Sequence, residues 1–455
     1  MAASRTLQPS NRVVAAVADS LVRHVPPGAK LTLALSGGLD SVVLLHALVS
    51  LRDGHAFHLH AVHVHHGLSP HAGRWADFCV RLCAGQEVVL DVHRVTIADD
   101  DPAGIEAAAR RERHRVFAAV DADFLLTAHQ QDDQGETLML QLLRGAGPKG
   151  LAAMPELGHH AGWRAAHLRP LLGVARSVLV AYARDHDLAW VEDESNVETR
   201  YRRNALRQEI MPRLAEYFPG SGATLARAAA LQADASELLD DLARHDAVSA
   251  IKGDRLDCEK LAALSRARAR NLLRHFIERN GLQMPNARRL DEALRQLLDA
   301  RHDARIHVEL GAKALWRFRG GAHLVGTAPP SAAPVRWRGE AVLEVPSAGV
   351  AVRMEAMTGA GLKRGLLEAG EVVLGVRQGG ERLRLYPDRP RRSLKNLLQE
   401  HSIPPWHRDR LPLLWCDGRL LWAAGIGMDA DAAAAPGEPG ILPRVTDQPA
   451  SFSGV

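Results

Sequence analysis

Between about residues 30 and 192, short apolar runs alternate with segments of helical spacing. The apolar runs predict strands at LTLAL (31–35), FHLHAVHV (57–64), EVVLDVHRV (87–95), DFLLTA (123–128) and LAWVE (188–192). The segments between them predict helices at 40–52, 74–84, 104–121, 133–144 and 175–187. Repeated strand–helix alternation predicts an α/β domain whose parallel sheet has helices on both faces. Ligands of such domains bind beyond the carboxyl ends of the strands.

The pattern of the sequence changes twice downstream of this region. From 203 to 325 it is mainly helical and ends in a hairpin-like run, HVELGAKALWRFRGGAHLVG. A stretch rich in Pro, Ala and Ser follows and is typical of a linker, and beyond it come short strands and one helix near 393–401. We therefore expect an α/β domain over 1–215, a mainly helical domain over 216–326, a linker over 327–339 and a small α+β domain over 340–455.

Composition excludes several classes of protein. No run of ~18 uninterrupted apolar residues is present, so neither a membrane-spanning helix nor a membrane partner is expected. The first residues lack the apolar core of a secretion signal, which predicts a cytoplasmic protein. The four cysteines include no C-x-x-C pair, which argues against a zinc ribbon, an iron–sulfur cluster and dithiol chemistry. Cys79 and Cys83 are expected as reduced thiols on one face of a helix.

A six-residue loop joins the first strand to the next helix. Two glycines allow positive φ and close backbone approach, so successive N–H groups and the helix N-terminus can hold an anion. The serine hydroxyls can bind phosphate, and the Asp40 carboxylate can hold Mg²⁺ beside it. The alternative is a plain turn whose polar residues cap the helix. The loop consists of Ser36, Gly37, Gly38, Leu39, Asp40 and Ser41.

Polar residues also follow the strand at 123–128. Asp132 and Asp133 are paired carboxylates at its carboxyl end, where they can coordinate Mg²⁺. Asp133 and Glu136 would also favour the N-terminus of the next helix, and the alternative is that this is their only role. His129 is expected either to contact the nucleotide or to be a hydrogen-bonded structural residue.

Cationic and imidazole side chains gather in two further places. On the helix at 104–121, Arg110, Arg113 and His114 share one face, which can bind phosphate or RNA or can simply be solvated. Seven histidines lie between 55 and 71, but strand alternation splits them over two faces. We therefore do not expect a metal site there.

Taken in order, these segments resemble the tRNA(Ile)-lysidine synthetase family of the N-type ATP pyrophosphatases. The loop at 36–41 resembles the pyrophosphate loop of that superfamily. The family's other motifs resemble HVHHGL (63–68), EAAAR (106–110), LTAHQQDDQGET (126–137), DESN (193–196) and RNALR (203–207). The resemblance covers about residues 28–215 strongly, and the run at 376–415 resembles the family's last domain. His114 and Ser69 depart from the family pattern, which usually has Tyr and often has Arg at these positions.

The resemblance implies an adenine nucleotide alpha hydrolase-like fold and a ligase that uses ATP and Mg²⁺. Such an enzyme joins free L-lysine to C2 of the wobble cytidine in the CAU anticodon of tRNA(Ile). It first adenylates the C2 oxygen and releases pyrophosphate, and the lysine amine then displaces AMP. The family is often dimeric, which leaves a homodimer open.

The resemblance also assigns roles to residues. With this chemistry in view, we expect Asp40 and Asp132 to hold Mg²⁺ with Asp133 in support, and Arg110 or Arg113 to stabilise developing charge or orient the tRNA. The loop at 36–41 and His129 would bind ATP. The residues implied to bind the substrate or the tRNA in this domain are Arg110, Arg203, Asn204 and Arg207.

A basic segment lies near the C-terminus. Between residues 376 and 410, nine cations and four acids leave +5, against +4 for the whole chain. Tyr386 and Trp406 interleave with the cations, as in surfaces that bind an RNA backbone and stack on bases. The alternative is a solvated surface. The expected tRNA contacts are Arg377, Arg382, Arg391, Arg392 and Lys395.

Three other functions remain as alternatives. A tRNA thiolase of the same superfamily would need a sulfur-handling Cys pair, which is missing. A non-catalytic tRNA-binding protein predicts loss of Asp40 or of the Asp132–Asp133 pair, and both are present. A synthetase acting on small molecules gives no reason for the basic segment.

Overall fold

The computed structural model describes residues 9–97, 101, 104–194, 202–299, 307–326 and 333–446. Ser195 and Asn196 of the DESN motif and the first residues of the expected linker lie outside this part of the chain. The protein divides into two compact units, Met1–Asp240 and Asp241–Val455. The domain boundaries expected from the sequence stay predictions. No helix among the described residues is long and apolar enough to cross a membrane.

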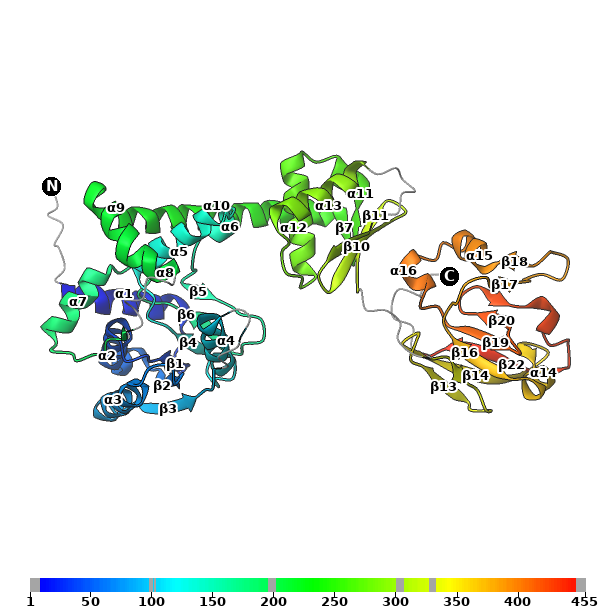
Figure 1. Cartoon of the computed structure of the whole chain (residues 1–455), viewed down its shortest axis with the longest axis horizontal. Helices are drawn as coiled ribbons and strands as arrows, with labels where there is room; N and C mark the ends of the chain where they lie inside the picture. The colour runs from blue at the N-terminus through cyan, green and yellow to red at the C-terminus, as the bar shows by residue number, and fades with distance from the viewer. Residues whose placement is uncertain are drawn as a thin grey trace. The chain divides into compact units, whose positions relative to one another are not determined.

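Unit 1 is built on a six-stranded sheet with the order β3-β2-β1-β4-β6-β5 (Figure 1). Every neighbouring pair is parallel except β5 and β6. The predicted α/β domain with a parallel sheet is therefore confirmed. The strands are β1 (Lys30–Ala34), β2 (His58–His65), β3 (Val89–Arg94), β4 (Phe124–Leu126), β5 (Leu157–Gly158) and β6 (Ala166–Leu168).

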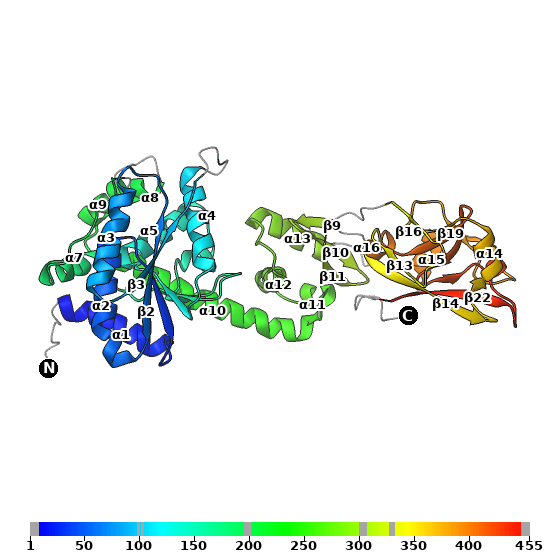
Figure 2. The ribbon, with the colours of Figure 1, turned by 90° about the horizontal axis from the view of Figure 1, so that it is seen from below.

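Helices cover both faces of this sheet (Figure 2). Leu31, Leu33 and Leu126 belong to the core that α1, α2 and α7 share, whereas Leu125 belongs to the core under α4. Successive strand residues point to opposite faces, so the two cores lie on opposite sides. The helices are α1 (Pro9–His24), α2 (Leu39–His55), α3 (Ala72–Gly85), α4 (Ile105–Ala118), α5 (Gln131–Leu143), α6 (Pro148–Leu151), α7 (Arg176–Asp185), α8 (Arg202–Ala205), the π-helix η2 (Leu206–Ile210), α9 (Met211–Tyr217) and α10 (Ser221–Ala250), which continues into unit 2.

The prediction of a strand at 188–192 is wrong. Those residues are irregular, and the Val191 N–H donates to the Gly37 carbonyl at 3.0 Å. Leu188 and Trp190 instead pack against the core from outside the sheet. The remaining parallel strand is β6. It does not form an apolar run in the sequence, because His167 stands at its centre.

Unit 2 contains the end of α10 and a five-stranded sheet with the order β7-β8-β11-β10-β9. The expected hairpin is confirmed as β10 and β11, which pair from Lys313–Gly326 to Phe318–Gly321. Three helices bury Leu272, Phe276 and Leu294 with this sheet. The elements are β7 (Ile251–Lys252), β8 (Arg255–Asp257), α11 (Cys258–Ala262), α12 (Arg266–Arg279), α13 (Ala287–Asp299), β9 (His307–Leu310), β10 (Lys313–Phe318) and β11 (Gly321–Gly326).

The last part of unit 2 is α+β, as predicted. Its main sheets have the orders β12-β16-β19-β20-β21 and β13-β14-β22-β15, and β17 pairs with β18. The elements are β12 (Val335–Arg336), β13 (Val342–Val345), β14 (Val350–Thr358), β15 (Leu362–Lys363), α14 (Arg364–Ala369), β16 (Val372–Gly375), β17 (Arg382–Leu383), β18 (Arg392–Ser393), α15 (Leu394–Glu400), α16 (Pro405–Arg408), β19 (Leu413–Cys416), β20 (Arg419–Ala423), β21 (Gly427–Met428), the 3-10 helix η3 (Ala430–Ala432) and β22 (Pro439–Val445).

Candidate active site

The six-residue loop forms the connection between β1 and α2 at the carboxyl end of the sheet. The Ser41 hydroxyl donates to the Gly38 carbonyl at 2.9 Å and accepts from the Gly37 N–H at 3.2 Å. The Ser36 hydroxyl accepts from the Gly38 N–H at 3.3 Å and lies 3.1 Å from the Ser41 hydroxyl. The loop thus gathers backbone donors and two hydroxyls at the N-terminus of α2, as anion binding requires.

Gly37 cannot be replaced without moving its neighbours. Its φ is +86°, and a Cβ there would lie 3.0 Å from both the Cys79 Sγ and the Val191 Cγ2. Cys79 is a free, buried thiol on α3, and burial raises its pKa to about 12. Cys79 therefore packs against the loop and is no nucleophile.

His63 supports the same loop from β2. Its Nδ1 lies 2.8 Å from the Leu35 carbonyl, one residue before Ser36. A carbonyl only accepts, so Nδ1 carries the proton. Burial lowers the pKa of His63, which keeps the ring neutral near pH 7. The HVHHGL motif thus ties the end of β2 to the end of β1.

Asp40 lies in the first turn of α2 among other carboxylates. Burial raises its pKa to about 6, the Asp133 and Asp132 charges add to the rise, and Arg176 and Arg207 oppose it. Its Oδ1 is buried and has no hydrogen-bond partner among the described residues. A carboxylate in this state is a site for a proton or a cation.

Asp133 and Glu136 on α5 are held by two arginines from the segment after the parallel sheet. Arg203 donates to Asp133 and to Glu136 at 2.9 Å each, and Arg207 donates to them at 2.8 and 2.6 Å. The Asp133 Oδ2 also accepts from the Gln130 N–H at 3.0 Å, which caps α5. Asp133 is therefore already committed to intramolecular partners. Glu136 was expected only to favour the start of this helix, although its place three residues after Asp133 puts it on the same face.

Two carboxylates are better placed for a cation. Asp132 is partly buried, and its pKa is raised by burial and by Glu136 and Asp133, while the Arg176 N–H lowers it. No group of three His, Cys, Asp or Glu side chains suited to a metal occurs among the described residues. Mg²⁺ keeps several waters and takes one or two carboxylates plus substrate phosphates. Asp40 and Asp132 fit that requirement.

His129 ends a chain of hydrogen bonds that sets its tautomer. The Arg169 guanidinium donates to the His167 Nδ1 at 2.9 Å, so the His167 proton lies on Nε2. That Nε2 donates to the Thr127 hydroxyl at 2.8 Å, and the hydroxyl donates to the His129 Nδ1 at 2.8 Å. Burial and nearby arginines lower the pKa of His129 to about 3. The neutral ring of His129 therefore presents Nε2–H, a donor suited to a phosphate or a base.

The α4 face combines a cation near the site with packed rings. Burial, Arg110 and Arg203 lower the pKa of Arg113, which places Arg113 near the Arg203 end of the site. The His114 ring lies edge-on to Trp163 at 5.3 Å and has a pKa lowered to about 4 by burial and both arginines. Arg110 is exposed. His114 is thus a neutral packed ring, and the two arginines carry the charge of this face.

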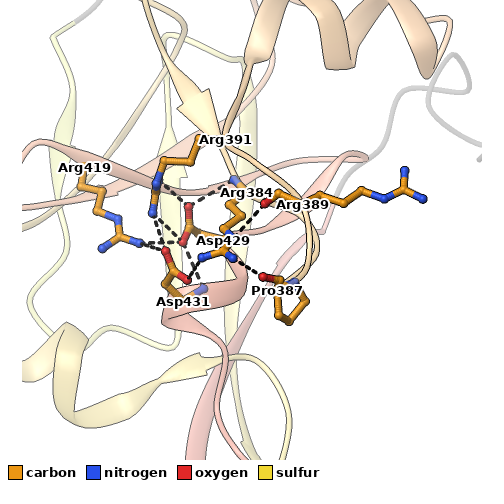
Figure 3. A network of polar contacts seen from close by, with 7 residues as sticks. All are labelled: Arg384, Pro387, Arg389, Arg391, Arg419, Asp429 and Asp431. Atoms are coloured by element: carbon orange, nitrogen blue, oxygen red, sulfur yellow. Dashed lines mark hydrogen bonds and ion pairs between the residues drawn. The ribbon is translucent and has the colours of Figure 1, made fainter.

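In unit 2, most of the predicted tRNA contacts have partners within the domain. Arg391 pairs with Asp429 and Asp431 (Figure 3), and Arg392 pairs with Glu400 at 2.6 Å. Arg377 lies 3.5 Å from Glu381, and Arg382 donates to the Arg391 carbonyl at 2.9 Å. Lys395 is exposed on α15.

The remaining residue expected to bind substrate or tRNA belongs to unit 1. Asn204 lies in α8 beside Arg203.

Sheet order, loop and buried carboxylates together define a PP-loop nucleotide-binding protein. Residues 10–214 match the family described as "PP-loop domain". Residues 256–323 match the "TilS substrate binding domain" and residues 372–445 the "TilS substrate C-terminal domain".

Relatives cover nearly the whole chain. The tRNA(Ile)-lysidine synthase of Nitrosomonas europaea is 40% identical over 97% of this chain and 97% of its own length. The enzyme of the same name from an Azoarcus species is 44% identical over 94% of each chain, and that of Aromatoleum aromaticum is 45% identical over 92% of this chain and 97% of its own. The chain belongs to the tRNA(Ile)-lysidine synthase family.

Proposed function

We propose that this chain uses ATP to join free L-lysine to C2 of the wobble cytidine in the CAU anticodon of tRNA(Ile). The cytidine O2 attacks the α-phosphorus of ATP, and the bond to the bridging oxygen of pyrophosphate breaks. The lysine amine then forms the C2–N bond, AMP leaves with the C2 oxygen, and the amine loses a proton. The product is lysidine.

The observation that carries this proposal is the loop at 36–41, in which the buried Oδ1 of Asp40 has no hydrogen-bond partner among the described residues. The loop amides and serines would hold the ATP phosphates, with the His129 Nε2–H as a further donor. Asp40 and Asp132 would hold Mg²⁺, which neutralises the charge of the leaving pyrophosphate. In-line transfer needs mainly positioning and charge stabilisation, to which Arg113 would contribute its charge.

Arg203 and Arg207 give the site its second half. Their guanidinium groups donate hydrogen bonds to Asp133 and Glu136, both of which are less than 10% exposed. We propose that this four-residue cluster, with Asn204 and Arg110, forms the end of the site that takes lysine and the nucleotide. We also propose that the enzyme works in the cytoplasm, where ATP and tRNA meet, and that it forms a homodimer.

The test is incorporation of labelled lysine into a tRNA(Ile) transcript with the CAU anticodon, with ATP and Mg²⁺ present. A methionine tRNA with the same anticodon is the matched control. Label in the isoleucine tRNA alone supports both the reaction and its selectivity. Pyrophosphate release with another acceptor would reject the substrate but keep the ATP chemistry, and no release at all would reject the enzyme.

A further inference from the structure

The loop between β17 and β18, residues 384–391, is attached to the rest of its domain by a buried acidic centre. The two nitrogens of Arg391 donate to the two oxygens of Asp429 at 2.8 and 3.1 Å, and Arg419 donates to Asp429 at 2.7 Å (Figure 3). Both arginines also bond Asp431. The Asp429 side chain is fully buried. A buried carboxylate requires such partners, so these two guanidinium groups are committed to the fold.

Arg384 completes this frame from the start of the loop. Its guanidinium pairs with Asp431 at 3.0 Å and donates to the carbonyls of Pro387 and Arg389 within the loop. Its backbone N–H donates to Asp429 at 3.3 Å. The two ends of the loop are therefore fixed to the same pair of aspartates, and the loop backbone is folded over the Arg384 side chain.

The tip of the loop is different, because all its residues from 386 to 390 are exposed. Tyr386 is 56% exposed, and the Arg389 Cζ lies 5.3 Å from the centre of its ring. In Figure 3 the Arg389 side chain extends away from the acidic centre. Pro387 and Pro390 restrict the backbone on either side. The Tyr386 ring and the Arg389 side chain are exposed, so they do not contribute to the packing of the core. They are available to bind a partner.

Trp406, the other aromatic residue of the basic segment, is already surrounded. Its ring centre lies 5.0 Å from that of His323 and 5.9 Å from those of Trp316 and Phe318. The rings of the two aromatic residues therefore differ in their surroundings. Trp406 packs against other rings, whereas Tyr386 is exposed to solvent.

We propose that the tip of the 384–391 loop is an RNA contact in which Tyr386 stacks on an unpaired or terminal base of the tRNA and Arg389 meets an adjacent phosphate, while Arg384, Arg391 and Arg419 only position the loop. Aromatic rings bind bases of any sequence through their π-faces, and arginine adds charge and planar stacking. The inference rests on the proposed tRNA substrate, and it moves the RNA contact from the paired arginines to the exposed tip.

The first test measures the affinity of the full-length protein for the tRNA(Ile) transcript over a range of salt concentrations. Tyr386→Ala should weaken binding about tenfold or more, because a base–aromatic stack is lost. The slope of log K against log salt should stay as in the wild type, since the ring carries no charge. Tyr386→Phe should bind like the wild type, because the hydroxyl is not needed for stacking. Equal binding by Tyr386→Ala and wild type would overturn the proposal.

The second test separates Arg389 from the paired arginines by charge. Arg389→Ala should weaken binding and lower the magnitude of the salt slope by about one, as expected for one lost phosphate contact. The control is the double variant Arg392→Gln with Glu400→Gln, which removes an ion pair of the same segment and leaves the net charge unchanged. Its affinity and slope should match the wild type. An unchanged slope in Arg389→Ala, or a reduced slope in the double variant, would overturn the assignment.

Failure of the proposed function gives a different result. If the wild-type protein itself shows no salt-dependent binding to the transcript, the tRNA substrate is rejected before any variant is compared. If the wild type binds and incorporates lysine but Tyr386→Ala, with unchanged thermal melting, binds equally well, only the loop contact is rejected.

Discussion

Asp40 shows how a proposed role in cation binding comes with a cost to stability. Its side chain is partly buried near two other carboxylates, and its buried Oδ1 has no hydrogen-bond donor among the described residues. Its pKa of about 6 means that the folded protein holds this proton more tightly than the unfolded chain does. Ionisation of Asp40 therefore opposes folding above that pH, unless a cation is bound.

We expect Asp40→Asn to abolish pyrophosphate release and to leave tRNA binding nearly unchanged. In the absence of Mg²⁺ the variant should also be more stable at pH 7, by on the order of 2 kcal/mol, because the buried charge is gone. The gain should disappear as the pH falls through about 6 towards 4, where the wild-type carboxyl is protonated in the folded state. Urea unfolding at pH 7 and pH 5 measures the stability difference. Turnover at the wild-type rate would contradict the metal assignment.

At the scale of elements, the ion pairs between α5 and the segment from α8 to η2 decide the shape of the site. Glu136 is 2% exposed and receives both Arg203 and Arg207. These contacts join residues 67 and 71 positions apart in the chain. A buried acid with two arginines depends on all its partners, because any charge left alone is poorly solvated.

Glu136→Gln should lower the free energy of unfolding by about 3–5 kcal/mol, since two arginines then share only Asp133. Hydrogen exchange should increase in α8, η2 and α9, which lose their attachment to α5. The control is Glu209→Gln, which removes an exposed acid of η2. Equal protection of these helices in Glu136→Gln and wild type would show that the cluster does not hold the segment.

The layer between the sheet and α4 belongs to the same scale, because partly and fully buried histidines lie there beside the aliphatic side chains. Burial lowers the pKa of His167 to about 2 and that of His129 to about 3, and nearby Arg169 adds to both shifts. In the unfolded chain such groups take up protons near pH 6.5. The stabilisation that comes from keeping them neutral is therefore complete above pH 6.5 and is lost as the pH falls below it.

For these two imidazoles alone, the free energy of unfolding should fall by on the order of 2 kcal/mol per pH unit between pH 6 and 5. Denaturant titrations of the whole protein at several pH values measure this slope. His167→Asn should reduce this slope by the contribution of about one proton, because one of the two neutral imidazoles is removed. A wild-type stability that does not change between pH 7 and 5 would contradict the histidine layer.

For the molecule as a whole, the local motifs were predictable and the long-range contacts were not. The loop at 36–41 and the parallel sheet could be read because glycine geometry, helix N-termini and apolar periodicity act within a few residues. The strand β6 escaped because His167 interrupts its three residues, and 188–192 misled because its apolar residues pack beside the sheet without joining it.

The basic segment makes the same point at the other end of the chain. The window from 376 to 410 contains nine cations and four acids, but folding adds Asp429 and Asp431 to its centre. Arg391 and Asp429 are 38 positions apart, so no local pattern shows that they are paired. Charge counting thus indicated the right region without separating arginines that build the loop from those that face solvent.

The sequence alone predicted the parallel-sheet α/β domain, the glycine-containing loop at 36–41 and the acidic residues near it, because each follows from neighbours in the chain. The resemblance of its motifs implied the class of nucleotide-binding domain. The fold in three dimensions decided which of those acids have partners: Asp133 and Glu136 are paired with arginines, whereas the Asp40 Oδ1 has no hydrogen-bond donor in the described part of the chain. It also set the tautomer of His129 through Arg169, His167 and Thr127. The physical reason is that the state of a polar group depends on burial and on the donors that reach it. Both come from segments that only folding brings together.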